Sequence, residues 1–170
     1  MTLKRVLIIG AGGFIGGFLC REALERGYET WAGVRQSTSR RWLTDPRFHF
    51  LTLDFDASPE EMAARLTEAL PDGQRWDYIV YNLGATKCAD FRDFNRINFQ
   101  YLRTFLDALD LAGKMPGRLL YMSSLSAIGP GDEKGYTPID ASTIPDPNTR
   151  YGLSKMKAEA LLESRSSTVP

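Results

Sequence analysis

The sequence predicts an α/β protein with a doubly wound parallel sheet that is covered by helices on both faces. Five short apolar runs alternate with longer segments of helical periodicity along the 170 residues, and no internal repeat is present. Strands that alternate with helices in this way pair in parallel, with the helices as crossover connections. A glycine-rich turn separates the first apolar run from the first helical segment. Because such crossovers are right-handed, few topologies remain, and we expect the strand order 3-2-1-4-5.

Length and charge balance narrow the class of protein. A chain of 170 residues can bury one sizeable core, so we expect a single domain over residues 1–170. The 21 acidic and 21 basic residues cancel, which argues against a nucleic-acid partner. No run reaches the roughly 18–20 apolar residues of a membrane span. We therefore expect a small-molecule partner and no membrane association.

Cysteine usage indicates a reducing compartment. Cys20 and Cys88 are isolated in the sequence and the single histidine, His49, is close to neither, so we predict no disulfide framework and no metal site. The apolar N-terminus superficially resembles a signal peptide, but glycines interrupt it and no small-residue cleavage site follows. We expect a cytoplasmic protein in which His49 has a structural role on a strand.

The N-terminal part of the chain predicts three strands and a helix. Arg5 to Ile9 is a short apolar run, typical of a strand that is buried on both faces. Helical spacing follows from Phe14 to Arg26, and Gly27 is placed to end that helix. Thr30 to Val34 and His49 to Leu53 are the second and third predicted strands.

The middle of the chain predicts two helices with a strand between them. Ser58 followed by Glu61 is a capping-box pattern, so we expect a helix to begin there and to continue through Leu70. Tyr78 to Tyr81 is the fourth strand. The next helix ends near Gly113, and one face of it carries Phe91, Phe94, Asn98, Tyr101 and Phe105.

The C-terminal part predicts a strand and a helix on either side of an irregular segment. Arg118 to Met122 is the fifth strand, and the last helix runs from about Arg150 to Glu163. Residues 129–149 are rich in glycine, proline and aspartate and show no periodicity. We expect this long segment to be mobile.

The turn after the first strand, Gly10-Ala-Gly-Gly13-Phe14-Ile15-Gly16, has the glycine spacing of a phosphate-binding loop. Gly10 permits the tight turn, Gly13 lets backbone N–H groups approach a pyrophosphate, and Gly16 lets the helix pack close to the sheet. The phosphates would meet the positive end of the helix dipole. The position within a strand-helix-strand unit favours cofactor binding over the alternative, a tight turn without a ligand.

The end of the second strand bears on which dinucleotide binds. NAD-binding versions of this turn usually have an acidic residue there for the ribose hydroxyls, and this sequence has none. Arg35, with Ser37, Arg40 and Arg41 nearby, is suited to a charge-assisted contact with the 2′-phosphate of NADP. We therefore expect NADP in preference to NAD. The alternative is that Arg35 is an ordinary solvated arginine.

Tyr151 and Lys155 lie one helical turn apart on one face of the last predicted helix. Of the seven tyrosines, this is the one with a lysine four residues later. A free tyrosine has a pKa of about 10, which a fixed cation nearby lowers. The pair is therefore suited to proton transfer with a hydroxyl or carbonyl group. The alternative is a simple contact on the helix surface.

Two further polar residues are candidates for the same site. Ligands of open parallel sheets bind beyond the carboxyl ends of the strands, so Ser124, after the fifth strand, is expected to face the cleft and hold the reacting oxygen. The alternative is that its hydroxyl satisfies the loop backbone. Asn98 lies in the apolar face of its helix, where a buried amide needs partners. It either braces backbone near the cleft or takes part in a proton relay.

These motifs occur in a familiar order. The glycine turn is followed by Asp54 after the third strand, by Asn82-Leu83-Gly84-Ala85 after the fourth, by Ser123-Ser124 after the fifth, and by the Tyr151/Lys155 pair. The set resembles the extended short-chain dehydrogenase/reductase family, in particular its NAD-dependent epimerase/dehydratase group, whose fold is Rossmann-like. The resemblance covers essentially the whole chain.

The resemblance implies a role for each motif. Tyr151 would be the catalytic acid/base, and Lys155 would tune it and bind the nicotinamide ribose. Ser124 would position the substrate, with Asn98 as the supporting residue. Cys88, after the fourth motif, either faces the substrate together with Lys87 or is a small buried residue. The implied cofactor contacts, with the adenine at Asp54 and Phe55, are Gly10, Gly13, Phe14, Ile15, Gly16, Arg35, Asp54, Phe55, Leu83, Gly84, Ala85 and Lys155.

The resemblance also implies further strands and a small substrate domain after the last helix. We interpret the chain as a C-terminally truncated N-terminal part that is inactive alone, with an unpaired fifth strand that invites dimerisation or disorder. The complete enzyme would move a hydride between NADP or NAD and a nucleotide sugar or other small carbonyl compound. Arg35 is closer to the pattern of the family's NADP-dependent reductases, so epimerase, dehydratase and reductase all stay open. The alternative function is a non-catalytic dinucleotide-binding sensor or scaffold.

Overall fold

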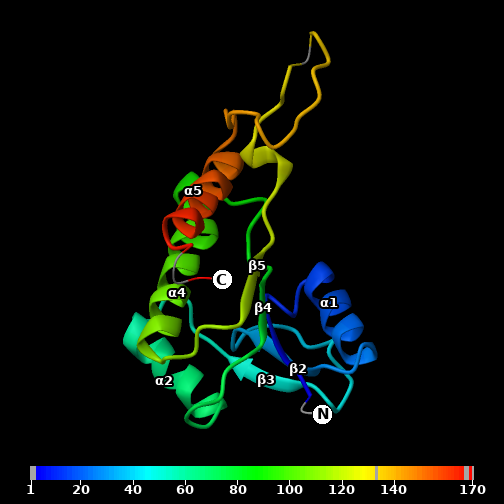
Figure 1. Ribbon diagram of the computed structural model, residues 1–170, viewed down its shortest axis with the longest axis vertical. Coiled ribbons are helices and arrows are strands. Elements are labelled where there is room, and N and C mark those ends of the chain that lie inside the picture. Colours follow the sequence, from blue (N-terminus) through cyan, green and yellow to red (C-terminus); the bar gives the residue numbers. More distant parts are fainter. Residues whose placement is uncertain (1–2, 133, 167–168, 170) are drawn as a thin grey trace. The chain divides into compact units, whose positions relative to one another are not determined.

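The computed structural model describes residues 3–132, 134–166 and 169, and it contains a five-stranded parallel sheet (Figure 1). All four strand pairings are parallel, and the order is β3-β2-β1-β4-β5, as predicted. The predicted strand boundaries are correct to within one residue. The strands are β1 (Arg5–Ile9), β2 (Glu29–Val34), β3 (His49–Thr52), β4 (Tyr78–Tyr81) and β5 (Arg118–Tyr121).

The chain forms two compact units. Among the described residues, the sheet unit comprises 3–83, 104–122, 166 and 169, and the helical unit comprises 84–103, 123–132 and 134–165. No helix in the described part of the chain combines the length and the apolar character that a membrane crossing requires.

Helix α1 (Phe14–Glu25) covers one face of the sheet and ends as predicted. Its buried side of Cys20, Ala23 and Leu24 packs with apolar side chains of β1 and β2. Gly27 has φ +79°, and its N–H donates to the Leu24 carbonyl at 3.0 Å, while the next N–H donates to the Ala23 carbonyl at 3.0 Å. This pair of bonds is a Schellman motif, which explains why the helix stops at a glycine.

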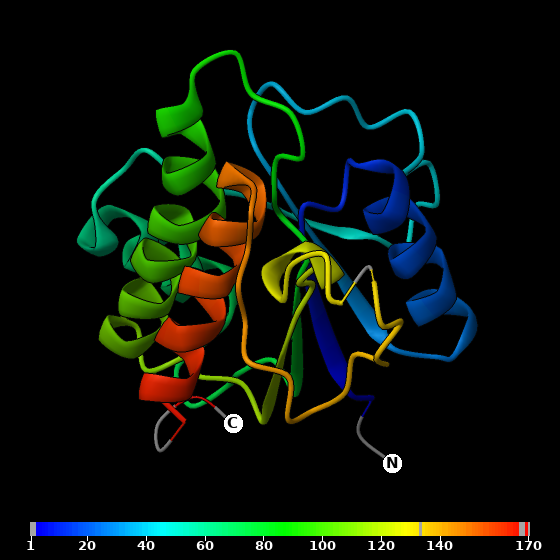
Figure 2. The ribbon, with the colours of Figure 1, turned by 90° about the horizontal axis from the view of Figure 1, so that it is seen from above.

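Helix α2 (Pro59–Ala69) and the later part of α4 (Tyr101–Leu111) cover the other face (Figures 1 and 2). The predicted capping box is present: the Glu61 N–H donates to the Ser58 hydroxyl and the Ser58 N–H donates to the Glu61 carboxylate. Phe105 of α4 is fully buried, and its ring centroid lies 5.5 Å from that of Tyr81 on β4. Each such buried apolar side chain stabilises the fold by about 1.5–3 kcal/mol.

The helix predicted from Phe91 onward is interrupted by a π-helical turn. Helix α3 (Phe91–Asn95) is followed by the turn η1 (Arg96–Gln100) and then by α4. The apolar spacing did not reveal η1, because the inserted turn keeps Phe94, Asn98 and Phe105 buried. Phe91 is the one member of the predicted set that is exposed. Phe91 is 69% exposed, since it lies in the first turn, directly after the N-cap Asp90.

Within the helical unit, α5 (Arg150–Ser164) packs on α3, on η1 and on the short 3₁₀ turn η2 (Leu125–Ala127). Figure 2 shows α5 running beside α3. Thr149 caps the start of α5, where its hydroxyl accepts from the Gly152 N–H at 2.9 Å. A Cβ at Gly152 would lie 2.1 Å from the Ser126 carbonyl oxygen, so this glycine permits α5 and η2 to touch.

The segment 129–149 has no helix or strand among its described residues, as predicted. Its two ends are joined where the Asp146 N–H donates to the Ile128 carbonyl at 2.7 Å. The carboxylates of Asp132 and Asp140 accept backbone N–H bonds inside it and hold two local turns. The expected mobility stays a prediction.

Candidate functional site

The glycine turn of the sheet unit is built from close backbone contacts. Gly10 has φ +81°, and the N–H groups of Gly10 and Ala11 both donate to the Gly33 carbonyl, at 3.1 and 3.2 Å. A Cβ at Gly16 would lie 2.2 Å from the Gly10 carbonyl oxygen, and a Cβ at Gly10 would lie 3.0 Å from the Leu83 nitrogen. The fold itself therefore requires glycine at positions 10 and 16.

Gly13 differs from Gly10 and Gly16, because no contact with the described residues requires a glycine at this position. The nearest heavy atom to a Cβ there would be the Gly10 carbonyl oxygen, at an ordinary 3.4 Å. Gly13 is the N-cap of α1, and the first amides of a helix have no acceptor within it. The first turn of α1 carries no acidic side chain, and Phe14 and Ile15 are exposed. The space above Gly13 therefore fits an anion such as a diphosphate.

The loop after β2 packs directly against this turn. A Cβ at Gly12 would lie 2.0 Å from the Thr38 methyl carbon and 3.2 Å from the Ser39 carbonyl oxygen. The Thr38 N–H donates to the Arg35 carbonyl, and the Thr38 hydroxyl accepts from the Arg35 N–H, both at 3.0 Å. This tight turn leaves the Arg35 side chain exposed beside the glycine turn. Sequence reasoning assigned no role to Gly12 or Thr38, since their contact is purely tertiary.

The other two arginines of the predicted basic group lie over aromatic rings. Arg40 lies over the Phe50 ring at 4.2 Å, and Arg41 lies over the Trp42 ring at 4.8 Å. Arg35 has no comparable contact with any described side chain. Of the predicted basic group, Arg35 is thus the member whose charge is available to a ligand.

The predicted adenine contacts after β3 have different environments. Asp54 is exposed, and its carboxylate accepts from the Asp56 N–H at 3.0 Å. The Phe55 side chain is buried, with its ring centroid 6.5 Å from that of Phe105. A ligand could therefore reach the Asp54 side chain, whereas at Phe55 the contact would fall to the backbone.

In the helical unit, Asn98 braces the backbone after β4. Its Oδ1 accepts from the Ala85 N–H at 2.7 Å, and its Nδ2 donates to the Ala85 carbonyl at 3.0 Å and to the Ser154 hydroxyl at 2.9 Å. The residue is fully buried in η1. Of the two roles that the sequence left open, the brace is present in the structure, and the proton relay stays a prediction.

Ser154 connects this brace to α5, and sequence reasoning missed it. Its hydroxyl accepts from Asn98 and donates to the Tyr151 carbonyl at 2.7 Å. The side chain is buried. A single serine on a helix gives no pattern by itself, although its position three residues after Tyr151 places it near the buried face.

Lys155 is a buried cation beside the same backbone. It is 4% exposed, and burial lowers the pKa of its amine to about 8, although Glu159 one turn later opposes the shift. A Cβ at Gly84 would lie 3.1 Å from the Asn98 Oδ1 and 3.2 Å from the Lys155 amine. Asn98 and Lys155 therefore converge closely on the Gly84 backbone, where a side chain would crowd both of them.

Tyr151 lies one turn before Lys155 on α5 and is partly buried. Its ring packs at 6.2 Å from the ring of Phe94 in α3. Ser124 precedes η2, and its hydroxyl oxygen accepts from the Ser126 N–H at 3.2 Å, which is the loop role named as its alternative. No acceptor for the Ser124 proton is present among the described residues, so that O–H can still donate to a ligand.

Cys88 and His49 have no feature of a reactive site. Burial and the nearby charge of Asp93 raise the pKa of Cys88, which disfavours the thiolate. His49 lies exposed on β3, stacked on Trp31 at 4.8 Å between ring centroids, and this fits its structural interpretation.

The strand order and the glycine turn after β1 define a Rossmann-like α/β protein of the dinucleotide-binding class. The model of the NAD dependent epimerase/dehydratase family matches residues 6–168, and the chain belongs to this family. The resemblance found in the sequence is thereby confirmed. No curated protein matches the chain in a sequence search.

Solved structures extend this result. The Bordetella bronchiseptica enzyme WbmG, in complex with NAD and UDP, is 26% identical with TM-score 0.73, and the match covers 99% of this chain and 51% of that one. The UDP-Glc/GlcNAc 4-epimerase of Campylobacter jejuni is 20% identical with TM-score 0.79, covering 96% and 49%. A putative epimerase of Burkholderia cenocepacia J2315 is 24% identical with TM-score 0.75, covering 98% and 52%. The chain thus spans about half the length of these proteins.

Proposed function

We propose that the complete protein is an NAD(P)-dependent enzyme that acts on a nucleotide sugar or another small carbonyl compound by hydride transfer. The observation that carries this proposal is the convergence of Asn98 and buried Lys155 on the bare backbone of Gly84, one turn from Tyr151. A protein that only sensed the dinucleotide would have no need of this arrangement. The nucleotide-sugar ligand and epimerase names of the similar structures support the substrate class.

The proposed cofactor is a dinucleotide, and the residues of the glycine turn are suited to hold it. The glycine turn offers a cradle that a side chain at Gly13 would fill, at the amino end of α1. Residues 10–16 would hold the diphosphate, and Asp54 and Leu83 to Ala85 would line the adenosine and nicotinamide parts. When bound, a nicotinamide supplies or accepts the hydride.

The chain's own residues would handle the proton. Tyr151 would exchange a proton with the reacting oxygen of the substrate, while the Ser124 O–H donates a hydrogen bond to the same oxygen. The Lys155 cation would favour the charged form of the phenol. Asn98 would fix the Ala85 backbone and, through Ser154, the first turn of α5.

The experiment that tests the proposal replaces Tyr151 by Phe in the complete protein and measures both dinucleotide affinity and turnover on a panel of nucleotide sugars. We expect unchanged affinity and a loss of turnover of at least about 100-fold, because one positioned acid/base contributes that much. If wild type and variant both bind the dinucleotide without any turnover, the sensor alternative replaces the enzyme.

We further propose a preference for NADP over NAD. Its support is the unengaged Arg35 beside the glycine turn and the lack of an acidic residue at the end of β2. The NAD in the WbmG complex argues for NAD, so a titration must decide. Arg35→Gln should weaken NADPH binding at least about tenfold and leave NADH binding unchanged. Equal affinity of the wild type for both dinucleotides would contradict the role of Arg35.

A further inference from the structure

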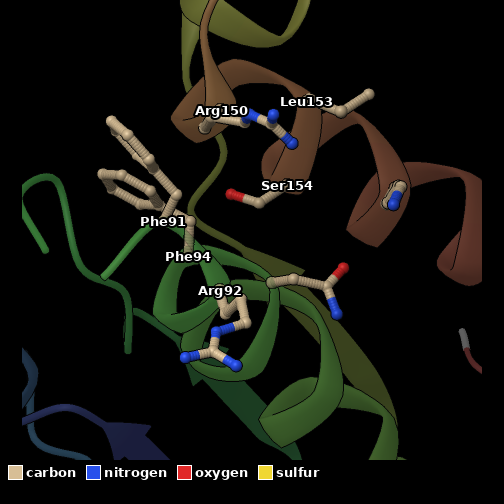
Figure 3. Close-up of a pocket in the computed structure, with 8 residues that line it drawn as sticks. Phe91, Arg92, Phe94, Arg150, Leu153 and Ser154 are labelled. Atoms are coloured by element: carbon tan, nitrogen blue, oxygen red, sulfur yellow. The ribbon is translucent and has the colours of Figure 1, made fainter.

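A pocket within the helical unit lies between α3 and α5 and has a volume of about 300 Å³. Figure 3 shows the side chains that α3 and α5 contribute to it. Its apolar lining comes from Phe91, Phe94 and Leu153, and its cationic lining from Arg92, Arg150 and Lys157. Rings and cations around one concave site are the usual lining of a small-ligand pocket.

The pocket uses a different face of α5 from the predicted catalytic pair. Arg150, Leu153 and Lys157 are spaced by three and four residues, so they form one stripe along the helix. Tyr151 and Lys155 form another stripe, and neither lines the pocket. The pocket nevertheless adjoins this pair, because Phe94, which lines the pocket, also packs against the Tyr151 ring.

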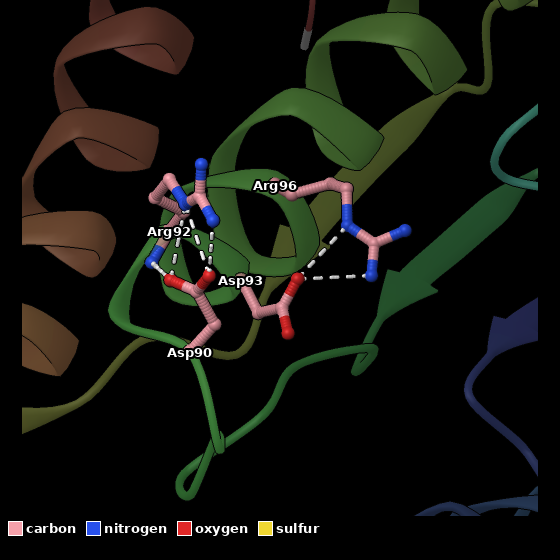
Figure 4. A network of polar contacts seen from close by, with 4 residues as sticks. All are labelled: Asp90, Arg92, Asp93 and Arg96. Carbon is pink, nitrogen blue, oxygen red and sulfur yellow. Dashed lines mark hydrogen bonds and ion pairs between the residues drawn. The ribbon is translucent and has the colours of Figure 1, made fainter.

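The three cations differ in what they already bind. The Arg92 guanidinium is held by the Asp90 carboxylate, with Nη2–Oδ2 at 2.7 Å and Nε–Oδ2 at 2.9 Å (Figure 4). Arg150 and Lys157 have no ion-pair partner in the described part of the chain, and both are exposed. No carboxylate lines the pocket among the described residues. Two positive charges without an ion-pair partner among the described residues therefore lie beside the apolar lining of the pocket.

We propose that this pocket binds a small organic anion, in which a phosphate or carboxylate group is attached to a flat or apolar body. Arg150 and Lys157 would hold the anionic group by charge-assisted hydrogen bonds. The exposed Phe91 ring, with Phe94 and Leu153, would cover the apolar body, which removes its surface from water. This inference does not depend on the proposed function.

The probe is phenyl phosphate, titrated calorimetrically into the 170-residue chain, with inorganic phosphate and phenol as half-ligands. We expect a Kd of about 1 mM or tighter for phenyl phosphate and at least about tenfold weaker binding of either half-ligand. Arg150→Gln and Lys157→Gln should each weaken phenyl phosphate about tenfold. Both residues are exposed, so these variants should fold normally, which circular dichroism checks.

Two control variants test whether the anion binds in this pocket and at no other place on the chain. Arg75→Gln removes the same charge from an exposed loop of the sheet unit and should leave binding unchanged. Gly13→Ala should also leave it unchanged; if it abolishes binding, the anion occupies the glycine turn and the inference fails. It fails equally if Arg150→Gln and Lys157→Gln bind like the wild type. Sedimentation that shows a dimer weakened by Arg150→Gln would assign this face to a second copy instead.

Discussion

The glycine turn of the sheet unit and the polar cluster of the helical unit achieve their geometry by opposite means. At the turn, Gly10 and Gly16 leave main-chain atoms so close together that a side chain would clash. In the cluster, the Asn98 side chain replaces missing backbone partners at Ala85 and reaches Ser154. The glycine turn is therefore disrupted when atoms are added, whereas the polar cluster is disrupted when atoms are removed.

The largest effect should follow from adding atoms at the turn. Gly16→Val would push its side chain into the Gly10 carbonyl, which is backbone and cannot move aside. We expect the free energy of unfolding to fall by about 3 kcal/mol or more, measured by urea denaturation. An unchanged urea midpoint would show that α1 can move away from β1, and the close packing of this turn would then be wrong.

Gly13→Ala is the matched variant for Gly16→Val. Because a Cβ there meets nothing closer than 3.4 Å, the loss of stability should be about 1 kcal/mol or less, typical of alanine at an N-cap. Dinucleotide affinity should nevertheless fall at least about tenfold, since the methyl group fills the cradle. Equal dinucleotide affinities of Gly13→Ala and wild type would show that the glycine turn does not bind the dinucleotide.

The second effect concerns the buried amine of Lys155. Burial lowers its pKa to about 8 from 10.5, so below pH 8 the charged amine bears the burial penalty in full. Between about pH 8 and 10.5 the folded state loses this proton while the unfolded chain keeps it, so the contribution to stability rises with pH. Relative to Lys155→Met, the wild type should gain up to about 3 kcal/mol over this range.

The measurement is a pair of urea-denaturation series, at neutral pH and at about pH 10. The difference between wild type and Lys155→Met isolates this one group from other side chains that titrate there. Parallel stability curves for the two proteins would mean that the amine has an ordinary pKa and is not buried.

A smaller effect should follow from removing atoms in the cluster. Asn98→Ala leaves the Ala85 N–H and carbonyl without their partner, and we expect a loss of about 2 kcal/mol. Ser154→Ala removes a single partner of Asn98 and should cost about 1 kcal/mol. Denaturation of both variants checks the ranking. If Ser154→Ala costs more than Asn98→Ala, α5 rather than the Ala85 backbone is what Asn98 stabilises.

Much of the fold could be predicted from the sequence because local signals and tertiary packing agree. The runs at β1 and β4 are apolar and end at turns, and Gly27 ends α1 by a local backbone motif. The π-helical turn η1 could not be predicted, because burial of Phe94 and Asn98 is also compatible with an uninterrupted helix. The spacing of apolar residues does not reveal the extra residue that a π-helical turn inserts into a helix.

The candidate site was predictable where a motif combines residue type and spacing, as for Gly10 to Gly16 and for the Tyr151/Lys155 pair. It was not predictable where a contact is created by the fold. Gly12 meets Thr38 and Ser154 meets Asn98 across gaps of many residues, and nothing nearby in the sequence announces either contact. At Phe55 the motif predicted a ligand contact, but the position in the motif does not indicate that the ring is buried.

If the main chain of the glycine turn holds the diphosphate of a dinucleotide, its amide groups must respond when the dinucleotide binds. Amide chemical shifts of the ¹⁵N-labelled chain, recorded during titration with NADPH and with NADH, measure this response. We expect the largest shifts at the N–H groups of residues 12–16, and Gly13→Ala should reduce them. Saturable binding without shifts of those amides would show that the dinucleotide does not bind at the glycine turn.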